Sequence, residues 1–190
     1  SAEEVKQGTM DDIESDLVLQ GLVSMVDPLR ESVPEAMISA RRAHIAINIV
    51  TGDFAPTALA IAKQAKVVAN DKDLIVISGE ELATMPDDEV LKQTLKGGTI
   101  FSRVSPEDKM RIVGLVRDAG KVVAVTGDGV NDAPALKHAT IGVAMGITGT
   151  DVAKEASEIV LLDDSFSSLI ASVREGRTIF ANIKIGVLSC

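Results

Sequence analysis

Residues 122–134 of this chain read Val-Val-Ala-Val-Thr-Gly-Asp-Gly-Val-Asn-Asp-Ala-Pro. The apolar start predicts a buried strand, and the glycines allow a tight turn before a helix that begins near Asn131. Asp128 and Asp132 are four residues apart across this turn, so both carboxylates can face one cation, while Asn131 can donate to a phosphate oxygen. A site with only a few carboxylate ligands suits Mg²⁺, because this ion keeps several waters and binds phosphate at the same time. The stretch therefore predicts a metal ion held against a phosphate.

An alternation of strands and helices continues along the chain. Strands are expected at 17–26, 44–50, 74–77, 99–104, 122–125, 141–144 and 159–162. Helices are expected at 34–42, 56–66, 78–95 with a break at Pro86, and 106–118, and others begin near Asn131 and Thr150. This order predicts an α/β fold with a doubly wound, mostly parallel sheet and helices on both faces. Ligands of such sheets bind beyond the carboxyl ends of the strands.

The chain divides into three parts. Residues 1–16 are polar and acidic and are expected to be a tail or hinge, and residues 17–165 are expected to form one α/β body. Residues 166–190 carry apolar side chains at mostly helical spacing, and predict a helix that leads toward a truncated transmembrane segment. No window approaches the roughly 18 to 20 consecutive apolar residues that span a bilayer, so the piece alone is expected to be soluble.

Composition excludes some functions. The net charge is -9, with no Trp, no Tyr and four Phe, whereas nucleic-acid binders need clustered cations and aromatic platforms. We therefore expect no nucleic-acid partner. The single cysteine, Cys190, cannot form an internal disulfide, which fits a reducing compartment.

Polar residues follow two other strands. They should meet the turn at residues 126–132, called the acidic turn below, at one edge of the sheet. Thr51-Gly52-Asp53 follows the strand at 44–50, and Lys109 lies in the first turn of the helix after the strand at 99–104. One Thr-Gly-Asp turn is commonly only a helix N-cap, and Lys109 could be a solvated lysine. The repetition of the Thr-Gly-Asp turn at Thr126-Gly127-Asp128 favours a phosphate cradle, with Lys109 as its cation. Arg103 could contact a nucleotide or be solvated.

Several segments together resemble the phosphorylation domain of the P-type cation-transporting ATPases, which belong to the haloacid-dehalogenase-like superfamily. They are Thr126-Gly-Asp-Gly-Val-Asn-Asp-Ala-Pro-Ala-Leu136, Ile49-Val-Thr-Gly-Asp53, Asp27-Pro-Leu-Arg30, Phe101-Ser-Arg-Val-Ser-Pro-Glu-Asp-Lys109 and Gly149-Thr-Asp-Val-Ala-Lys-Glu-Ala156. The match runs from about residue 17 to residue 184 and is closest in style to the calcium and sodium/potassium branch.

The resemblance implies roles around the metal ion. Asp128 is expected to coordinate Mg²⁺, and Asn131 and Asp132 are expected to support the phosphate and the metal. Lys109 is expected to neutralise developing charge.

It also implies roles around the phosphate and the nucleotide. Thr51 and Gly52 are expected to contact phosphoryl oxygens, Asp53 to lie near the nucleotide and metal, and Arg103 to approach the ribose. Phe54 follows Asp53 where the family more often has a polar residue.

The activity implied is phosphoryl transfer from ATP to an aspartate, followed by hydrolysis, with Mg²⁺ as cofactor. The partners implied are the nucleotide-binding, actuator and membrane domains of a pump, at the cytoplasmic face of a membrane. Two alternatives remain open: a freestanding interaction or regulatory protein derived from a pump, and a soluble phosphatase of the same superfamily.

The family's nucleophile segment, Asp-Lys-Thr-Gly-Thr, does not occur in this chain. That segment forms the central strand of the family's sheet, between the strands that end at Thr51 and Thr126. The isolated chain is therefore expected to be inactive. Buried, unpaired backbone groups would cost about 1 to 3 kcal/mol each. We therefore predict that the gap closes, or is filled by another strand or by a second chain, as in a homodimer.

Overall fold

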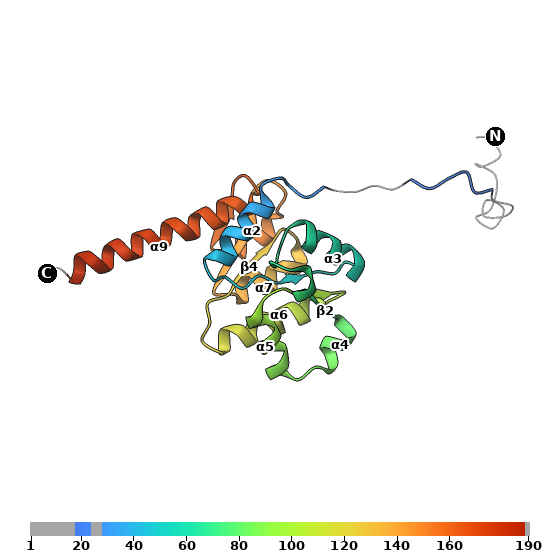
Figure 1. Cartoon of the computed structure of the whole chain (residues 1–190), viewed down its shortest axis with the longest axis horizontal. Coiled ribbons are helices and arrows are strands. Elements are labelled where there is room, and N and C mark those ends of the chain that lie inside the picture. The colour runs from blue at the N-terminus through green and yellow to red at the C-terminus, as the bar shows by residue number, and fades with distance from the viewer. Residues whose placement is uncertain (1–17, 24–27, 189–190) are drawn as a thin grey trace.

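The computed structural model describes residues 18–23 and 28–188 (Figure 1). The strands are β1 (Ile49–Val50), β2 (Ile75–Ser78), β3 (Thr99–Ser102), β4 (Ala124–Gly127), β5 (Ile141–Met145) and β6 (Ile159–Leu161). The α-helices are α2 (Val33–Arg42), α3 (Ala55–Gln64), α4 (Gly79–Thr84), α5 (Asp87–Lys96), α6 (Pro106–Asp118), α7 (Ala133–His138), α8 (Asp151–Glu155) and α9 (Phe166–Leu188). Short 3-10 helices, η1 (Asp71–Asp73) and η2 (Val130–Asp132), precede β2 and α7. The predicted α/β alternation is confirmed.

The strands form two parallel sheets of three strands each, in the orders β1-β3-β2 and β4-β5-β6. In the first sheet β3 is central because it pairs on both sides, and all four of its residues are buried. Side chains alternate across it: Phe101 packs with Leu82 of α4 and Ile112 of α6, whereas Ile100 packs with Ala58 and Ala62 of α3. Helices therefore cover both faces of this sheet.

The second sheet is built in the same way around β5. Val143 packs with Leu161 and Leu169, and Ala144 packs with Leu136 and Ala153. These contacts place α9 on one side of the sheet and α7 and α8 on the other.

Within the described residues, no strand pairs β1 with β4 or occupies the space between them. The prediction that the gap closes, or is filled by another strand of this chain, is therefore wrong for those residues. It assumed that the free edges would be buried. Ala124 and Thr126 of β4 are instead exposed, so water can satisfy the backbone groups of this edge and the expected penalty does not arise.

Two predicted strands are shortened or absent. Residues 18–23 form no strand, and their apolar side chains Val18, Leu19, Leu22 and Val23 are exposed; the rest of the predicted strand at 17–26 lies outside the described residues. The strand at 44–50 is reduced to Ile49–Val50. Apolar residues form a strand only where another strand is available for pairing, and none of the described strands pairs with residues 18–23.

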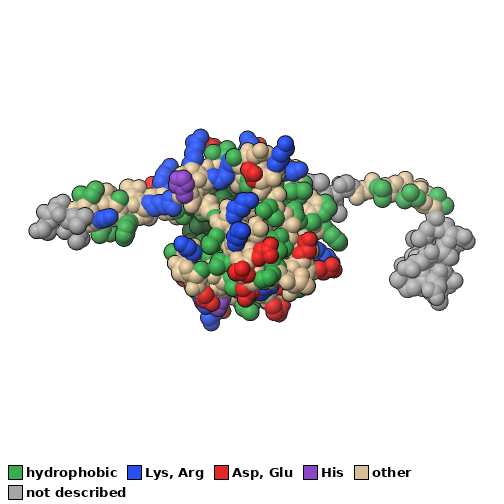
Figure 2. Space-filling view, turned by 60° about the horizontal axis from the view of Figure 1, so that its bottom comes forward, with side chains coloured by type: hydrophobic (Ala, Val, Ile, Leu, Met, Phe, Trp, Pro, Cys, Tyr) green, Lys and Arg blue, Asp and Glu red, His purple; other side chains and the backbone are tan. Residues whose placement is uncertain are grey.

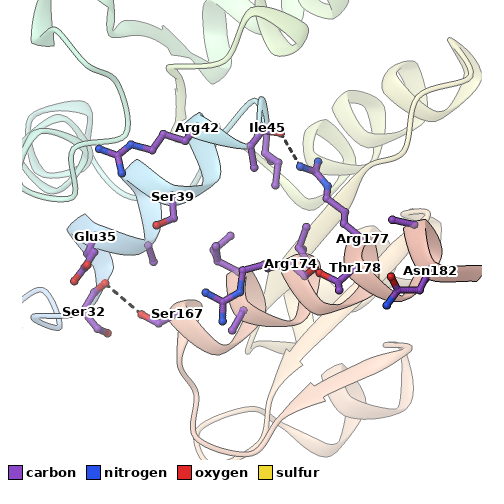
Figure 3. A pocket seen from close by; sticks show the side chains of 16 residues that line it. Ser32, Glu35, Ser39, Arg42, Ile45, Ser167, Arg174, Arg177, Thr178 and Asn182 are labelled. Carbon is purple, nitrogen blue, oxygen red and sulfur yellow. Dashed lines mark hydrogen bonds between the residues drawn. The ribbon is translucent and has the colours of Figure 1, made fainter. Parts of the chain in front are cut away.

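Helix α9 packs against α2 at its base and then projects from the body (Figure 1). A cavity of about 850 Å³ lies between the two helices (Figure 3), and its lining includes none of the residues 126–132. Two hydrogen bonds connect the helices there, from Arg177 Nη1 to the Ala43 carbonyl at 2.9 Å and from Ser167 Oγ to the Ser32 carbonyl at 3.2 Å. In the part of the chain that the structure describes, no helix has the length and apolarity needed to cross a membrane.

The charges are unevenly distributed over the surface. On the face shown in Figure 2, acidic side chains gather over the lower half of the body, whereas Lys and Arg predominate over the upper half and at the base of α9. The net charge of -9 therefore does not describe the surface around every site.

Candidate functional site

A second cavity, of about 380 Å³, lies where the carboxyl ends of β1 and β4 face each other. Eight residues line it: Val50, Thr51, Lys109, Thr126, Gly127, Asp128, Asp132 and Met145. The first two come from β1 and the loop after it, and most of the others from β4, the acidic turn and α6. The unpaired gap between the sheets therefore opens beside the polar residues that the sequence singled out.

An ion pair connects the two halves of this site. Lys109 Nζ lies 2.7 Å from Asp132 Oδ1, and each side chain is 18% exposed. Asp132 Oδ2 also accepts a hydrogen bond from the Gly129 amide at 3.2 Å. Lys109 is held in the first turns of α6, whose N-cap is a capping box between Ser105 and Asp108. Asp132 is thus already engaged on both carboxylate oxygens.

The acidic turn depends on one glycine and one distant amide. A Cβ at Gly127 would lie 2.4 Å from Asp132 Cβ, so this position accepts no side chain without displacing Asp132. The carbonyl of Asp128 accepts a hydrogen bond from the amide of Thr150 at 2.8 Å, and Thr150 caps α8. The Asp128 side chain is exposed and forms no hydrogen bond or ion pair with the described residues. Asp128 is therefore the carboxylate of this turn that remains available.

The Thr51-Gly52-Asp53 turn is organised internally. Thr51 Oγ1 donates to Asp53 Oδ2 at 3.0 Å and accepts from the Asp53 amide at 3.1 Å. A Cβ at Gly52 would meet no atom within 4 Å, so the approach to this turn is open. The backbone of Arg103 adjoins it, because the Arg103 amide donates to the Asp53 carbonyl at 3.2 Å.

The structure brings together four of the predicted site residues, Thr51, Lys109, Asp128 and Asp132. The other four, Gly52, Asp53, Arg103 and Asn131, do not line the cavity and lie beside or after its lining residues.

Two lining residues, Val50 and Met145, were not predicted as part of the site. Both stand at the carboxyl end of a parallel strand, which is the feature that could have indicated them.

Asp164 lies outside the cavity and acts on the loop between β5 and α8. This buried residue has a left-handed backbone, and its carboxylate accepts from the amides of Ile147 and Thr148 at 2.9 and 2.8 Å and from Thr148 Oγ1 at 2.8 Å. The Ile147 amide, with the Thr148 groups, lowers the pKa of the Asp164 carboxyl from 3.8 to about 2. Arg30 Nη1 donates to the Asp164 carbonyl at 2.8 Å. Asp164 therefore fixes the loop that leads to Thr150.

The donor set fits Mg²⁺ better than a metal that needs a closed protein cage. Within the described ranges, no group of three or more His, Cys, Asp or Glu side chains could hold a metal ion. Asp128 supplies one available carboxylate, and Asp132 is paired with Lys109. Mg²⁺ characteristically binds through one or two carboxylates plus phosphate and water oxygens. The residues present therefore fit this ion when a phosphate accompanies it.

Comparisons with known proteins indicate the family to which the chain belongs. The family model described as haloacid dehalogenase-like hydrolase matches residues 3–140. The chain is 50% identical over 175 residues to an endoplasmic reticulum-type calcium-transporting ATPase 4 from Arabidopsis thaliana, covering 90% of this chain and 16% of that protein. It is 46% identical over 179 residues to calcium-transporting ATPase 1 from Bacillus cereus, covering 94% of this chain and 20% of that protein. The chain thus spans a fifth or less of the length of these two relatives.

Solved structures of pumps share the fold. A zinc-transporting PIB-type ATPase in the E2.Pi state is 30% identical, with a TM-score of 0.61, over 83% of this chain and 21% of that one. The catalytic domain of the CPx-ATPase CopB-B is 25% identical, with a TM-score of 0.55, over 74% of this chain and 44% of that one. The chain belongs to the haloacid dehalogenase-like hydrolases, and the resemblance of its sequence to the catalytic domain of P-type ATPases is confirmed.

Proposed function

We propose that this chain is the metal- and phosphate-binding part of the phosphorylation domain of an ATP-driven cation pump. The observation that supports this most directly is the meeting of Thr51, Lys109, Asp128 and Asp132 around one cavity. A hydroxyl, an ammonium group and two carboxylates are suited to hold phosphoryl oxygens together with a divalent ion. The names of the two relatives support calcium as the transported cation.

Each residue has a proposed task. Asp128 would hold Mg²⁺ with support from Asp132, and the ion would supply charge neutralisation at the phosphoryl oxygens. Lys109 adds its positive charge at the same oxygens, and Asp132 holds the ammonium group in place at 2.7 Å. The Asn131 amide donates to a phosphate oxygen.

The residues after β1 complete the cradle. Thr51 donates its hydroxyl and Gly52 its backbone amide to the phosphoryl oxygens, and the open approach at Gly52 leaves room for them. Asp53 and Arg103 lie farther along this edge, on the side from which ATP delivers its phosphate.

The phosphoryl acceptor comes from outside the described residues. A strand carrying Asp-Lys-Thr-Gly-Thr would lie between β1 and β4, whose facing edges have no partner among the described strands. Such a strand would satisfy both edges and place its aspartate next to Lys109 and Asp128. In the complete pump, residues 17–165 would form the phosphorylation body at the cytoplasmic face, and residues 166–190 would lead toward the membrane domain.

Adding the missing segment tests the proposal. The chain is mixed with a synthetic peptide that contains Asp-Lys-Thr-Gly-Thr, with Mg²⁺ and beryllium fluoride, and the melting temperature is measured. Saturation is expected to raise the melting temperature by about 5 to 10 °C. Asp128→Asn is expected to abolish this rise, whereas the matched exposed substitution Asp88→Asn on α5 is expected to keep it. A rise that survives Asp128→Asn would contradict the proposal.

Two further measurements separate the alternatives. The free edges could also pair with a second copy of the chain, and light scattering would then show a dimer that the peptide dissociates. Without the peptide, we expect no Mg²⁺-dependent turnover of p-nitrophenyl phosphate, because the nucleophile is absent. Turnover that disappears in Asp128→Asn would favour a soluble phosphatase instead.

A further inference from the structure

An exposed arginine and an exposed phenylalanine form a pair at the edge of the proposed site. The guanidinium carbon of Arg103 lies 4.5 Å from the ring centroid of Phe54, a cation–π distance. Phe54 is 65% exposed although it is large and apolar, and it stands directly after Thr51-Gly52-Asp53 as the N-cap residue of α3. Phe54 belongs to no core cluster of the described residues, so their packing does not require an aromatic ring at this position.

The backbone of Arg103 is held by polar contacts, whereas its side chain rests only on the Phe54 ring among the described residues. Arg103 has φ 56°, a left-handed conformation that L residues rarely adopt. Its amide donates to the Asp53 carbonyl, and its carbonyl packs so closely on Gly79 that a Cβ there would lie 2.4 Å away. Among the described residues the guanidinium has no hydrogen bond or ion pair, and Phe54 is its contact.

We propose that Phe54 is a positioning residue, whose ring holds the Arg103 guanidinium ready to bind the diphosphate or ribose of a nucleotide. The inference rests on the proposed function, because it takes the cavity beside Thr51 as the place of the transferred phosphate. Without the ring, Arg103 would sample many rotamers and lose more freedom when a nucleotide binds. The ring removes part of that cost before binding and leaves all five N–H donors of the guanidinium free.

The chemistry favours a nucleotide over a simple phosphate ion at this pair. Lys109, Thr51 and Asp128 line the cavity, and Phe54 and Arg103 do not. A ligand that reaches both places must extend beyond one phosphate group. The affinity for inorganic phosphate should therefore not depend on Phe54, whereas the affinity for ADP should.

The experiment is a titration of the full 190-residue chain, with Mg²⁺ present, by ADP and separately by inorganic phosphate. NMR follows the Arg103 Nε–Hε signal and the backbone amides of residues 51–53, Lys109 and Asp128. A contact between the Phe54 ring and the Arg103 side chain is expected already in the free chain. Phe54→Leu is expected to raise the Kd for MgADP about two- to fivefold, the equivalent of one exposed cation–π contact, and to leave phosphate binding unchanged. Phe54→Tyr keeps an aromatic ring and is expected to bind MgADP with wild-type affinity.

A double-mutant cycle distinguishes positioning from direct stacking. In an Arg103→Ala background, Phe54→Leu should have no further effect, because the ring acts through the guanidinium. Phe180→Leu on α9 is the matched control, since Phe180 is 70% exposed and has no cation over its ring among the described residues. It should leave both affinities unchanged.

Three outcomes would overturn the inference. They are an effect of Phe54→Leu that persists without Arg103, equal effects on ADP and phosphate, and a wild-type chain that binds no ADP at millimolar concentration. The proposed function fails in a different way. In that case inorganic phosphate would not perturb Thr51, Lys109 and Asp128, whatever ADP does at Arg103.

Discussion

Lys109 Nζ and Asp132 Oδ1 lie 2.7 Å apart, and this contact links α6 to the acidic turn after β4. Both side chains are mostly shielded from water, so the pair is less screened than a surface ion pair. The same contact sets the charge of the site: it leaves Asp128 as the available carboxylate and keeps the ammonium group at the cavity wall.

Lys109→Met should lower the free energy of unfolding by about 1 kcal/mol, because Asp132 keeps only the Gly129 amide as partner. Urea denaturation measures the change. The double variant with Asp132→Asn should be less destabilised than the sum of the two single variants. Additive effects would show that the contact contributes nothing to stability. Lys92→Met, at an exposed position on α5, serves as the control.

Gly127→Ala should lower the free energy of unfolding by about 1 to 3 kcal/mol, because the new methyl group collides with Asp132. It should also reduce the rise in melting temperature that Mg²⁺ and beryllium fluoride cause in the presence of the Asp-Lys-Thr-Gly-Thr peptide. Gly129→Ala is the matched variant two residues on, where the nearest atom to a Cβ is 3.6 Å away and φ is -100°. Equal stability of the two variants, measured by thermal unfolding, would contradict the close approach at Gly127.

Ser102→Ala should raise the free energy of unfolding by about 1 kcal/mol. Ser102 Oγ is buried and has no hydrogen-bond partner, so its removal relieves a desolvation cost. Thr99→Val on the same strand should have the opposite sign, because Thr99 Oγ1 donates to the Gln93 carbonyl at 3.1 Å. Chemical denaturation of both variants tests the pair of signs, and destabilisation by Ser102→Ala would refute the assignment of an unsatisfied hydroxyl.

Asp164→Asn should destabilise the protein at neutral pH and lose this effect in acid. The pKa of the folded carboxyl is about 2, below the ordinary 3.8, so the unfolded chain binds the proton more tightly. The contribution of this carboxylate is therefore complete above about pH 4 and is lost as the pH falls toward 2. The melting temperatures of the wild-type protein and the variant should therefore converge as the pH is lowered from about 4 toward 2. A constant difference would mean that hydrogen bonding to the charged carboxylate is not the cause.

Local sequence determined the helices better than the strands. The Ser105 cap and the proline after it predict the start of α6, Pro86 separates α4 from α5, and helical spacing predicts α9 from Phe166 onward. These features act within a few residues. A strand depends on a partner distant in sequence, which explains why residues 18–23 form none.

The site shows the same division. The turn chemistry identified Thr51, Asp128 and Asp132, because each follows a strand at a glycine-containing turn. The contact of Lys109 with Asp132 spans 23 positions, and the hydrogen bonds of Asp164 to Ile147 and Thr148 span 17 and 16. Pairings of this range follow from the assembled fold and not from a local pattern.

The separation of the two sheets also bears on how the chain acquires its structure. All strands of one sheet lie within residues 49–102 and all strands of the other within 124–161. Each sheet is therefore assembled from one uninterrupted stretch of chain, which keeps loop-closure entropy small and favours rapid formation of each half. Helix α6 lies between the two stretches. Its Lys109 pairs with Asp132 of the second half, so α6 is the element through which a folded first half can contact and order the second.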